Sequence, residues 1–305
     1  MDNNIIETFD LTKIYTLKGK KKAIKAINNI NISIKEGEIF GLLGPNGAGK
    51  TTTISILTTL LQPTSGYALI DGYDILKKPK HAKAKISLML ESDILYHRLT
   101  GYDNLKFFCK IYKVPKYKEK IYKKAKEFGI EKWLKQYVEK FSSGMKMKLA
   151  LCRTLLLERP ILFLDEPTIG LDVKTTSFIV DKLKELNSTI FLTSHNMSVV
   201  EKLCDRIAFI NKGNIIKIGT KEDIAKVSQS AIDVEIKISE NKETLKSEIE
   251  QQEFTEQVLN TKEGLIISLK NREYYSKLLE IISKYKIRMI KELDFSLEDL
   301  FLKII

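Results

Sequence analysis

The chain has few cysteines, and none of them stands near another. Cys109, Cys152 and Cys204 are the only three among 305 residues. None belongs to the Cys-x-x-Cys spacing that zinc and redox sites use, so a cysteine-based metal or redox centre is excluded. Three separate thiols are typical of a protein that works in a reducing compartment.

Long apolar runs and sequence repeats are also missing. No run approaches the length that a bilayer-spanning helix needs, and the N-terminus has no signal-peptide pattern. No internal repeat or low-complexity tract is found along the chain. We therefore predict a soluble, cytoplasmic protein, which acts at a membrane only through a partner.

Arginine is scarce, and the positive charge comes almost entirely from lysine. The net charge of +12 is compatible with nucleic-acid binding, with an anionic membrane surface or with a lysine-rich proteome. Lysines are spread along the whole chain, which favours the last of these. The densest runs, residues 78–85 and 110–126, are typical of solvated helix faces, and we expect no specific nucleic-acid partner.

Length and hydrophobic patterning indicate two domains. Residues 1–225 alternate strand-like and helical runs, which predicts an α/β domain with a mixed sheet and flanking helices. Residues 100–140 carry no strong strand signal and are predicted to be a helical insertion. The predicted strands are rich in aliphatic and β-branched residues: Ile30–Ile34, Ile39–Leu43, Tyr67–Ile70, Ile161–Leu164, Ile190–Thr193 and Arg206–Ile210.

Residues 230–305 have a different pattern and are predicted to form a small α+β domain. Ile232, Val234, Ile236 and Ile238 alternate with polar residues, which indicates a half-buried strand. A helix near 245–249, strands at 254–259 and 265–269, a helix at 275–282 and a strand at 287–293 are expected to follow. This βαββαβ order is typical of a split βαβ module, and a last helix is predicted over Ser296–Leu302.

A glycine-rich turn lies between the apolar segment Ile39–Leu43 and an amphipathic stretch, Thr52–Leu61, which we expect to be a helix. A strand, such a turn and a helix start form a phosphate cradle, in which backbone N–H groups and the helix dipole face the β- and γ-phosphates. Lys50 adds a point charge, and Thr51 can hold Mg²⁺. The predicted phosphate-binding residues are Gly44, Pro45, Asn46, Gly47, Ala48, Gly49, Lys50, Thr51 and Thr52.

A second apolar strand, Ile161–Leu164, ends in two carboxylates, Asp165 and Glu166. Phosphoryl transfer needs a metal, a charge cradle and a positioned nucleophile. Asp165 is therefore predicted to bind Mg²⁺, and Glu166 to orient and deprotonate the attacking water. Upstream, Phe141–Met145 stands directly before a predicted helix, residues 146–157, where a serine hydroxyl and backbone N–H groups form a second anion site.

Taken in their order along the chain, these motifs resemble those of the nucleotide-binding subunit of ATP-binding cassette (ABC) transporters. Phe141–Met145 stands where that family has its signature, Thr168–Asp172 resembles the D-loop, and Thr193–His195 resembles the switch-histidine motif. Tyr15 stands where the family stacks an aromatic ring on adenine. The resemblance covers residues 5–219, and it implies a P-loop NTPase core with an antiparallel β edge and a helical subdomain at about 92–145.

The resemblance also implies an activity and partners. In the family two cassettes face each other head to tail, so Ser142, Ser143 and Gly144 would contact ATP held by the partner's phosphate loop. Asp172 would lie at the dimer interface, and His195 would contact the γ-phosphate. The implied function is Mg²⁺-dependent ATP hydrolysis that powers a separately encoded transmembrane permease, on the cytoplasmic face of the membrane.

The sequence resembles one subgroup of the family more closely than the others. It also departs from the family pattern at two motifs, the Q-loop and the signature. The phosphate loop, the Ser-Ser-Gly-Met signature and the ending Ser296–Phe301 look like the multidrug, daunorubicin-resistance and sodium-extrusion ATPases, which implies export. Glu91 stands where the family's Q-loop has a glutamine that touches Mg²⁺; a carboxylate could still reach the metal. Ser143 replaces the first signature glycine, and Met145 replaces a glutamine.

Two other functions remain as alternatives. The first is a non-transport ABC ATPase that acts on nucleic acid or ribosomes; the short span from Gly49 to Ser142 and the single cassette disfavour it. The second is a nucleotide-binding regulator with a degenerate cassette; the presence of Lys50, Asp165, Glu166 and His195 disfavours it. The resemblance implies that the permease, and not this chain, selects the cargo.

Overall fold

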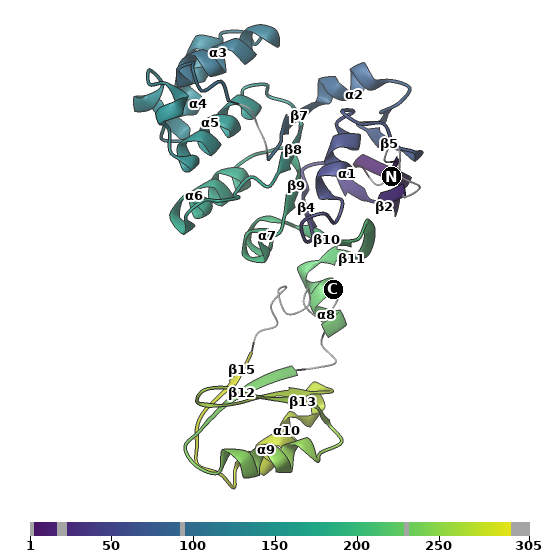
Figure 1. Ribbon diagram of the computed structural model, residues 1–305, viewed down its shortest axis with the longest axis vertical. Coiled ribbons are helices and arrows are strands. Elements are labelled where there is room, and N and C mark those ends of the chain that lie inside the picture. Colours follow the sequence, from purple (N-terminus) through teal and green to yellow (C-terminus); the bar gives the residue numbers. More distant parts are fainter. Residues whose placement is uncertain (1–2, 17–22, 92–94, 229–231, 294–305) are drawn as a thin grey trace. The chain divides into compact units, whose positions relative to one another are not determined.

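The computed structural model describes residues 3–16, 23–91, 95–228 and 232–293. The chain divides into two units, one up to Ile218 and one from Gly219 onward, each with its own sheet and helices (Figure 1). Within the described ranges, no helix combines the length and the apolar character that crossing a bilayer requires.

A six-stranded sheet forms the centre of the first unit, in the order β11-β10-β4-β9-β8-β7. The neighbours from β10 to β7 pair in parallel. Every residue of β4, β8 and β9 is buried, because helices or a second sheet cover both faces of a parallel sheet. The strands are β4 (Ile39–Leu43), β7 (Ile86–Met89), β8 (Ile161–Asp165), β9 (Thr189–Ser194), β10 (Arg206–Asn211) and β11 (Asn214–Thr220).

A second, antiparallel sheet has the order β2-β1-β5-β6, with β3 also paired to β1. Its strands are β1 (Asn4–Thr16), β2 (Ala23–Ile30), β3 (Ser33–Lys35), β5 (Ser65–Ile70) and β6 (Tyr73–Asp74).

The single strand predicted over Ile30–Ile34 is wrong, because two strands, β2 and β3, meet there. Asn29, the residue before the last one of β2, has a positive φ of 47°, which asparagine tolerates and which interrupts the extended backbone. The Asn31 side chain then bonds Asp10 Oδ1 at 2.9 Å. The chain therefore changes its position along β1 between Ile30 and Ser33.

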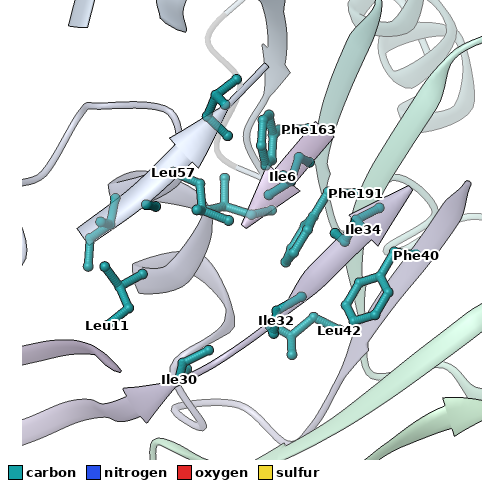
Figure 2. Packing of buried hydrophobic residues seen from close by; sticks show 14 of the residues in the cluster. Ile6, Leu11, Ile30, Ile32, Ile34, Phe40, Leu42, Leu57, Phe163 and Phe191 are labelled. Atoms are coloured by element: carbon teal, nitrogen blue, oxygen red, sulfur yellow. The ribbon is translucent and has the colours of Figure 1, made fainter. Parts of the chain in front are cut away.

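The two sheets enclose the main core. Phe40, Phe163 and Phe191 come from three neighbouring central strands, with ring centroids 5.6 Å apart for Phe40–Phe191 and 5.5 Å for Phe163–Phe191. Ile6 and Ile34 of the antiparallel sheet belong to the same buried cluster (Figure 2). Burying these side chains contributes roughly 1.5–3 kcal/mol each, which holds the central strand ends in place.

Helices surround the central sheet, and a helical insertion follows β7. Within the insertion, Thr100 caps α3 by accepting a hydrogen bond from the backbone N–H of Asp103. The structure confirms the predicted helical character of residues 100–140. The helices of this unit are α1 (Lys50–Leu57), α2 (Pro79–Lys85), α3 (Gly101–Ile111), α4 (Tyr117–Glu127), η1 (Glu131–Trp133), η2 (Val138–Lys140), α5 (Ser143–Leu155), α6 (Val173–Lys184) and α7 (Met197–Leu203).

The second unit is a four-stranded antiparallel sheet in the order β13-β14-β12-β15, with two helices packed on one face (Figure 1). Burial alternates along β12, as predicted, and the predicted βαββαβ order is confirmed. The predicted helix over Ser296–Leu302 lies outside the described residues. The elements are α8 (Lys221–Ser228), β12 (Ile232–Ile238), α9 (Lys242–Glu250), β13 (Thr255–Asn260), β14 (Gly264–Leu269), η3 (Arg272–Tyr274), α10 (Tyr275–Ile282) and β15 (Ile287–Glu292).

Candidate active site

The carboxyl ends of four parallel strands meet at one edge of the central sheet. Leu43 at the end of β4 pairs with Ser194 of β9, and Asp165 at the end of β8 pairs with Thr193. The loop after each of these strands therefore starts at the same level. Ligands bind at this edge in open α/β sheets, and the glycine-rich turn, the two carboxylates and His195 lie at or directly after the ends of β4, β8 and β9.

The glycine-rich turn after β4 is held close to the neighbouring backbone. A Cβ on Gly44 would lie 2.3 Å from the carbonyl oxygen of Ile210, and a Cβ on Gly49 would lie 2.5 Å from that of Ala26. Gly49 also has a φ of +112°, which side chains rarely allow. These two positions accept only glycine, and they fix the turn that begins α1.

A cavity of about 280 Å³ opens beside this turn. Helix α1 starts there without an acidic side chain in its first turn and without a side-chain cap. Its first N–H groups are therefore available to an anion, and the helix dipole favours negative charge at that end. The cavity is lined by Ala26, Asn46, Gly47, Gly49, Lys50, Thr51, Thr52, Glu91 and Glu166.

Lys50, Glu166 and His195 form one connected group. The Glu166 carboxylate lies 3.2 Å from Lys50 Nζ through Oε1 and 3.0 Å from His195 Nδ1 through Oε2. Lys50 Nζ also donates to the carbonyl oxygens of Gly44 at 2.7 Å and Pro45 at 3.3 Å. Glu166 is only 3% exposed, so its carboxylate is held in one place at the cavity wall.

Asp165 is fully buried behind this group, and Thr193 holds it. The Thr193 hydroxyl donates to Asp165 Oδ1 at 2.5 Å and accepts from the backbone N–H of Glu166 at 3.1 Å. The other Asp165 oxygen, Oδ2, has no hydrogen-bond donor within the described part of the chain. A buried carboxylate oxygen without a donor is costly unless a cation or water completes it.

These groups fit Mg²⁺. The ion binds through one or two carboxylates, with water and phosphate oxygens completing its shell. Asp165 Oδ2 and the hydroxyl of Thr51 are oxygen ligands of this kind, and Glu91 lines the same cavity. Among the described residues no group of three or more His, Cys, Asp or Glu side chains forms a metal site by itself, so the phosphates of a nucleotide would supply the remaining ligands.

The signature residues and Asp172 are placed together, but away from this cavity. Ser142 caps α5 by accepting from Met145 N at 3.3 Å, and Asp172 caps α6 by accepting from Thr175 N at 2.9 Å. A Cβ on Gly144 would lie 3.2 Å from Thr175 Cγ2, so the two helix starts are adjacent. The structure does not bring Ser142, Ser143, Gly144 or Asp172 into the lining of the cavity in the same chain.

Tyr15 also lies outside the lining. It stands near the end of β1, is 40% exposed, and has Lys13 Nζ 5.5 Å from its ring centroid. Residues 17–22, which follow it, are not among the described residues. Its stacking on adenine therefore stays a prediction.

Two residues at the site were not predicted. The β2 residue Ala26 lines the cavity, but a lone alanine carries no sequence signal; only the packing of its carbonyl against Gly49 shows its place. Thr193 binds the Asp165 carboxylate and the backbone N–H of Glu166, and its position directly before Ser194 and His195 at a strand end was a usable signal.

The sequence is similar to known families and proteins. A family described as ABC transporter matches residues 27–169. The chain is 35% identical over 304 residues to the uncharacterized ABC transporter ATP-binding protein YhcH of Bacillus subtilis strain 168, covering 95% of each. It is 35% identical to the ABC transporter ATP-binding protein NatA of the same strain, over 69% of this chain and 88% of NatA. It is 40% identical to the linearmycin resistance ATP-binding protein LnrL, also of that strain, over 72% and 70%.

Solved structures show the same fold. An ATP-binding subunit of an ABC transporter matches with a TM-score of 0.65 and 28% identity, over 73% of this chain and 93% of that one. The cassette MJ0796, in a dimeric post-hydrolysis state with ADP and Pi, matches with a TM-score of 0.65 and 26% identity, over 70% and 98%. Both similarities concern ATP-binding cassettes.

Proposed function

The chain belongs to the ABC transporter family of ATP-binding subunits, which hydrolyse ATP, and we propose that it powers export through a separately encoded permease. The observation that carries the proposal is the Glu166 carboxylate, held between Lys50 and His195 at the wall of a phosphate-sized cavity. The resistance function in the name of LnrL supports export as the direction.

The described residues have complementary tasks in hydrolysis. The turn from Gly44 to Gly49 and the start of α1 bind the β- and γ-phosphates through backbone N–H groups. Lys50 lines the cavity, and its ammonium would offer a positive charge to the γ-phosphate. Glu166 orients the attacking water and accepts its proton, and His195 positions the Glu166 carboxylate beside the γ-phosphate.

Thr51 and Asp165 would hold Mg²⁺, and Glu91 lines the same cavity as Thr51. The ion, when bound, would neutralise charge on the phosphates of the nucleotide. Tyr15 would stack on the adenine ring, because its ring is half exposed at the end of β1.

A second cassette would complete the site. Ser142, Ser143, Gly144 and Asp172 form a surface of two adjacent helix starts that does not line the chain's own cavity. Helix N-termini with small residues are suited to a phosphate, so this surface would cover the nucleotide bound by another copy. The dimeric state of MJ0796 supports a head-to-tail dimer.

The permease would bind the helical subdomain, at about residues 92–145. Exposed aromatic side chains gather on this insertion, and among them Phe107 is 40% exposed and Tyr112 51% exposed. Such side chains mark a protein interface. We place the subunit at the cytoplasmic face of the membrane, with residues 1–225 as the cassette and 230–305 as an accessory domain.

The oligomeric state of the Glu166→Gln variant in ATP and Mg²⁺, measured as its molar mass in solution, tests this function. The variant keeps the shape of the side chain but cannot accept a proton, so ATP stays intact and we expect a stable dimer by light scattering. In the control, Lys50→Ala, the phosphate cradle loses its point charge, and the protein should stay a monomer. A Glu166→Gln variant that binds ATP but remains a monomer at all protein concentrations would refute the dimeric site.

A further inference from the structure

A carboxylate enters the phosphate cavity from the strand beside the catalytic one. Met89, the last residue of β7, pairs with Leu164 of β8. Two residues later each strand delivers a carboxylate, Glu91 from β7 and Glu166 from β8, and both line the cavity. Glu91 is an exposed residue of this lining, so its charge is accessible to a ligand that enters from solvent.

The lining of the cavity carries more negative than positive side-chain charge, although a polyphosphate is itself negative. Its ionisable side chains are one cation, Lys50, and two carboxylates, Glu91 and Glu166. The Lys50 ammonium already lies 3.2 Å from Glu166 Oε1. The start of α1 adds the equivalent of roughly half a positive charge. The lining is therefore negative overall, although the backbone turn within it is shaped for phosphate.

We propose that Glu91 makes nucleotide binding conditional on a divalent cation. The inference rests on the proposed ATP site and goes further, because it assigns Glu91 a selective role. The carboxylate repels metal-free ATP, whose phosphates carry close to four negative charges, and it attracts the cation of the chelated nucleotide. A neutral amide at this position offers an oxygen to the metal without the repulsion.

The size of the effect follows from Coulomb interactions at a partly exposed site. One charge near several phosphate charges, at the effective dielectric of a protein surface and in moderate salt, changes an equilibrium constant by about tenfold. The Glu91→Gln variant should bind metal-free nucleotide more tightly and the cation more weakly. Both changes lower one ratio: the dissociation constant of the nucleotide measured without metal, divided by the dissociation constant measured with metal.

Equilibrium binding of a fluorescent, non-hydrolysable ATP analogue measures this ratio directly. The full-length protein is titrated in EDTA and again in saturating Mg²⁺, at fixed ionic strength. We expect the ratio to fall about tenfold in Glu91→Gln and to be kept in Glu91→Asp. Glu131→Gln removes the same charge from an exposed side chain on η1, outside the cavity, and should leave the ratio unchanged.

Paramagnetic resonance of Mn²⁺ gives a second readout, which does not depend on turnover. With the analogue bound, the Mn²⁺ concentration at half-saturation should rise several-fold in Glu91→Gln. Equal ratios and equal Mn²⁺ affinities in wild type and Glu91→Gln would overturn the inference while leaving the ATP site in place. Failure of the wild type to bind the analogue even with Mg²⁺ would refute the proposed function itself.

Discussion

Replacing Thr193 by valine would remove the hydroxyl that joins the Asp165 carboxylate to the backbone N–H of Glu166, while nearly keeping the volume of the side chain. The Thr193 hydroxyl is the hydrogen-bond donor to Asp165 Oδ1, at 2.5 Å, and Asp165 Oδ2 has no donor in the described part of the chain. Valine would therefore leave a fully buried carboxylate without a hydrogen bond. Hydrogen bonds to charged groups contribute about 1.5–3 kcal/mol, and we expect Thr193→Val to lower the free energy of unfolding by about 2–3 kcal/mol.

The matched control is Thr154→Val in α5. Thr154 is equally buried, but its hydroxyl donates to a neutral acceptor, the carbonyl oxygen of Ala150, at 3.0 Å. Its loss should cost about 1 kcal/mol or less. The free energy of unfolding of both variants is measured by urea titration without metal. The relevant transition is the one that moves to a higher urea concentration when nucleotide is added.

Mg²⁺ and a non-hydrolysable ATP analogue should restore part of the Thr193→Val loss, because a cation at Asp165 Oδ2 would compensate for negative charge that the missing donor leaves on the carboxylate. They should stabilise wild type and Thr154→Val equally. A Thr193→Val loss no larger than that of Thr154→Val, or a loss that the metal leaves unchanged, would refute the assignment of Asp165 as a metal ligand held by Thr193.

Two further predictions concern the turn and the thiols. Gly49→Ala should weaken Mg²⁺–ATP binding by at least tenfold in calorimetry, because the new Cβ would lie 2.5 Å from the carbonyl oxygen of Ala26; Gly37→Ala, at a φ of +79° with open space around it, should not change nucleotide affinity. Burial raises the pKa of the Cys109 thiol to about 11, and it raises the pKa of the Cys152 thiol further still. Because only the thiolate reacts, iodoacetamide at pH 8 should label both cysteines slowly in the native protein and rapidly in urea; fast native labelling would contradict their burial.

Continuous apolar runs were sufficient to predict the central strands. Ile39–Leu43 and Ile161–Leu164 are buried on both faces, and such strands need no long-range information to be recognised. Alternation along Ile232–Ile238 was equally informative, because one face of that strand packs on the helices of its own unit. The antiparallel sheet was harder, because its strands mix charged and polar residues and are stabilised by partners distant in sequence.

The site was predictable where a chemical requirement fixes a residue type. A glycine-rich turn before Lys50 and paired carboxylates after a buried strand rarely occur together in a chain that does not bind nucleotide. Ala26 could not be predicted, because it reaches the cavity only through the pairing of β1 with β2 and the contact of its backbone with Gly49. Glu91 was predicted as a metal ligand only through its place in the Q-loop; the register of β7 against β8 puts it two residues beyond the strand end, and it lines the cavity.

Steady-state release of phosphate from ATP, by the purified full-length protein and its Glu166→Gln variant, tests the central claim most directly. We predict Mg²⁺-dependent turnover in the wild type and a loss of roughly 10²–10⁴-fold in the variant, the range for removal of a general base. Nucleotide affinity should be kept or increased, because the change removes one negative charge from the cavity wall. Equal turnover by the two proteins would contradict the assignment of Glu166 as the base.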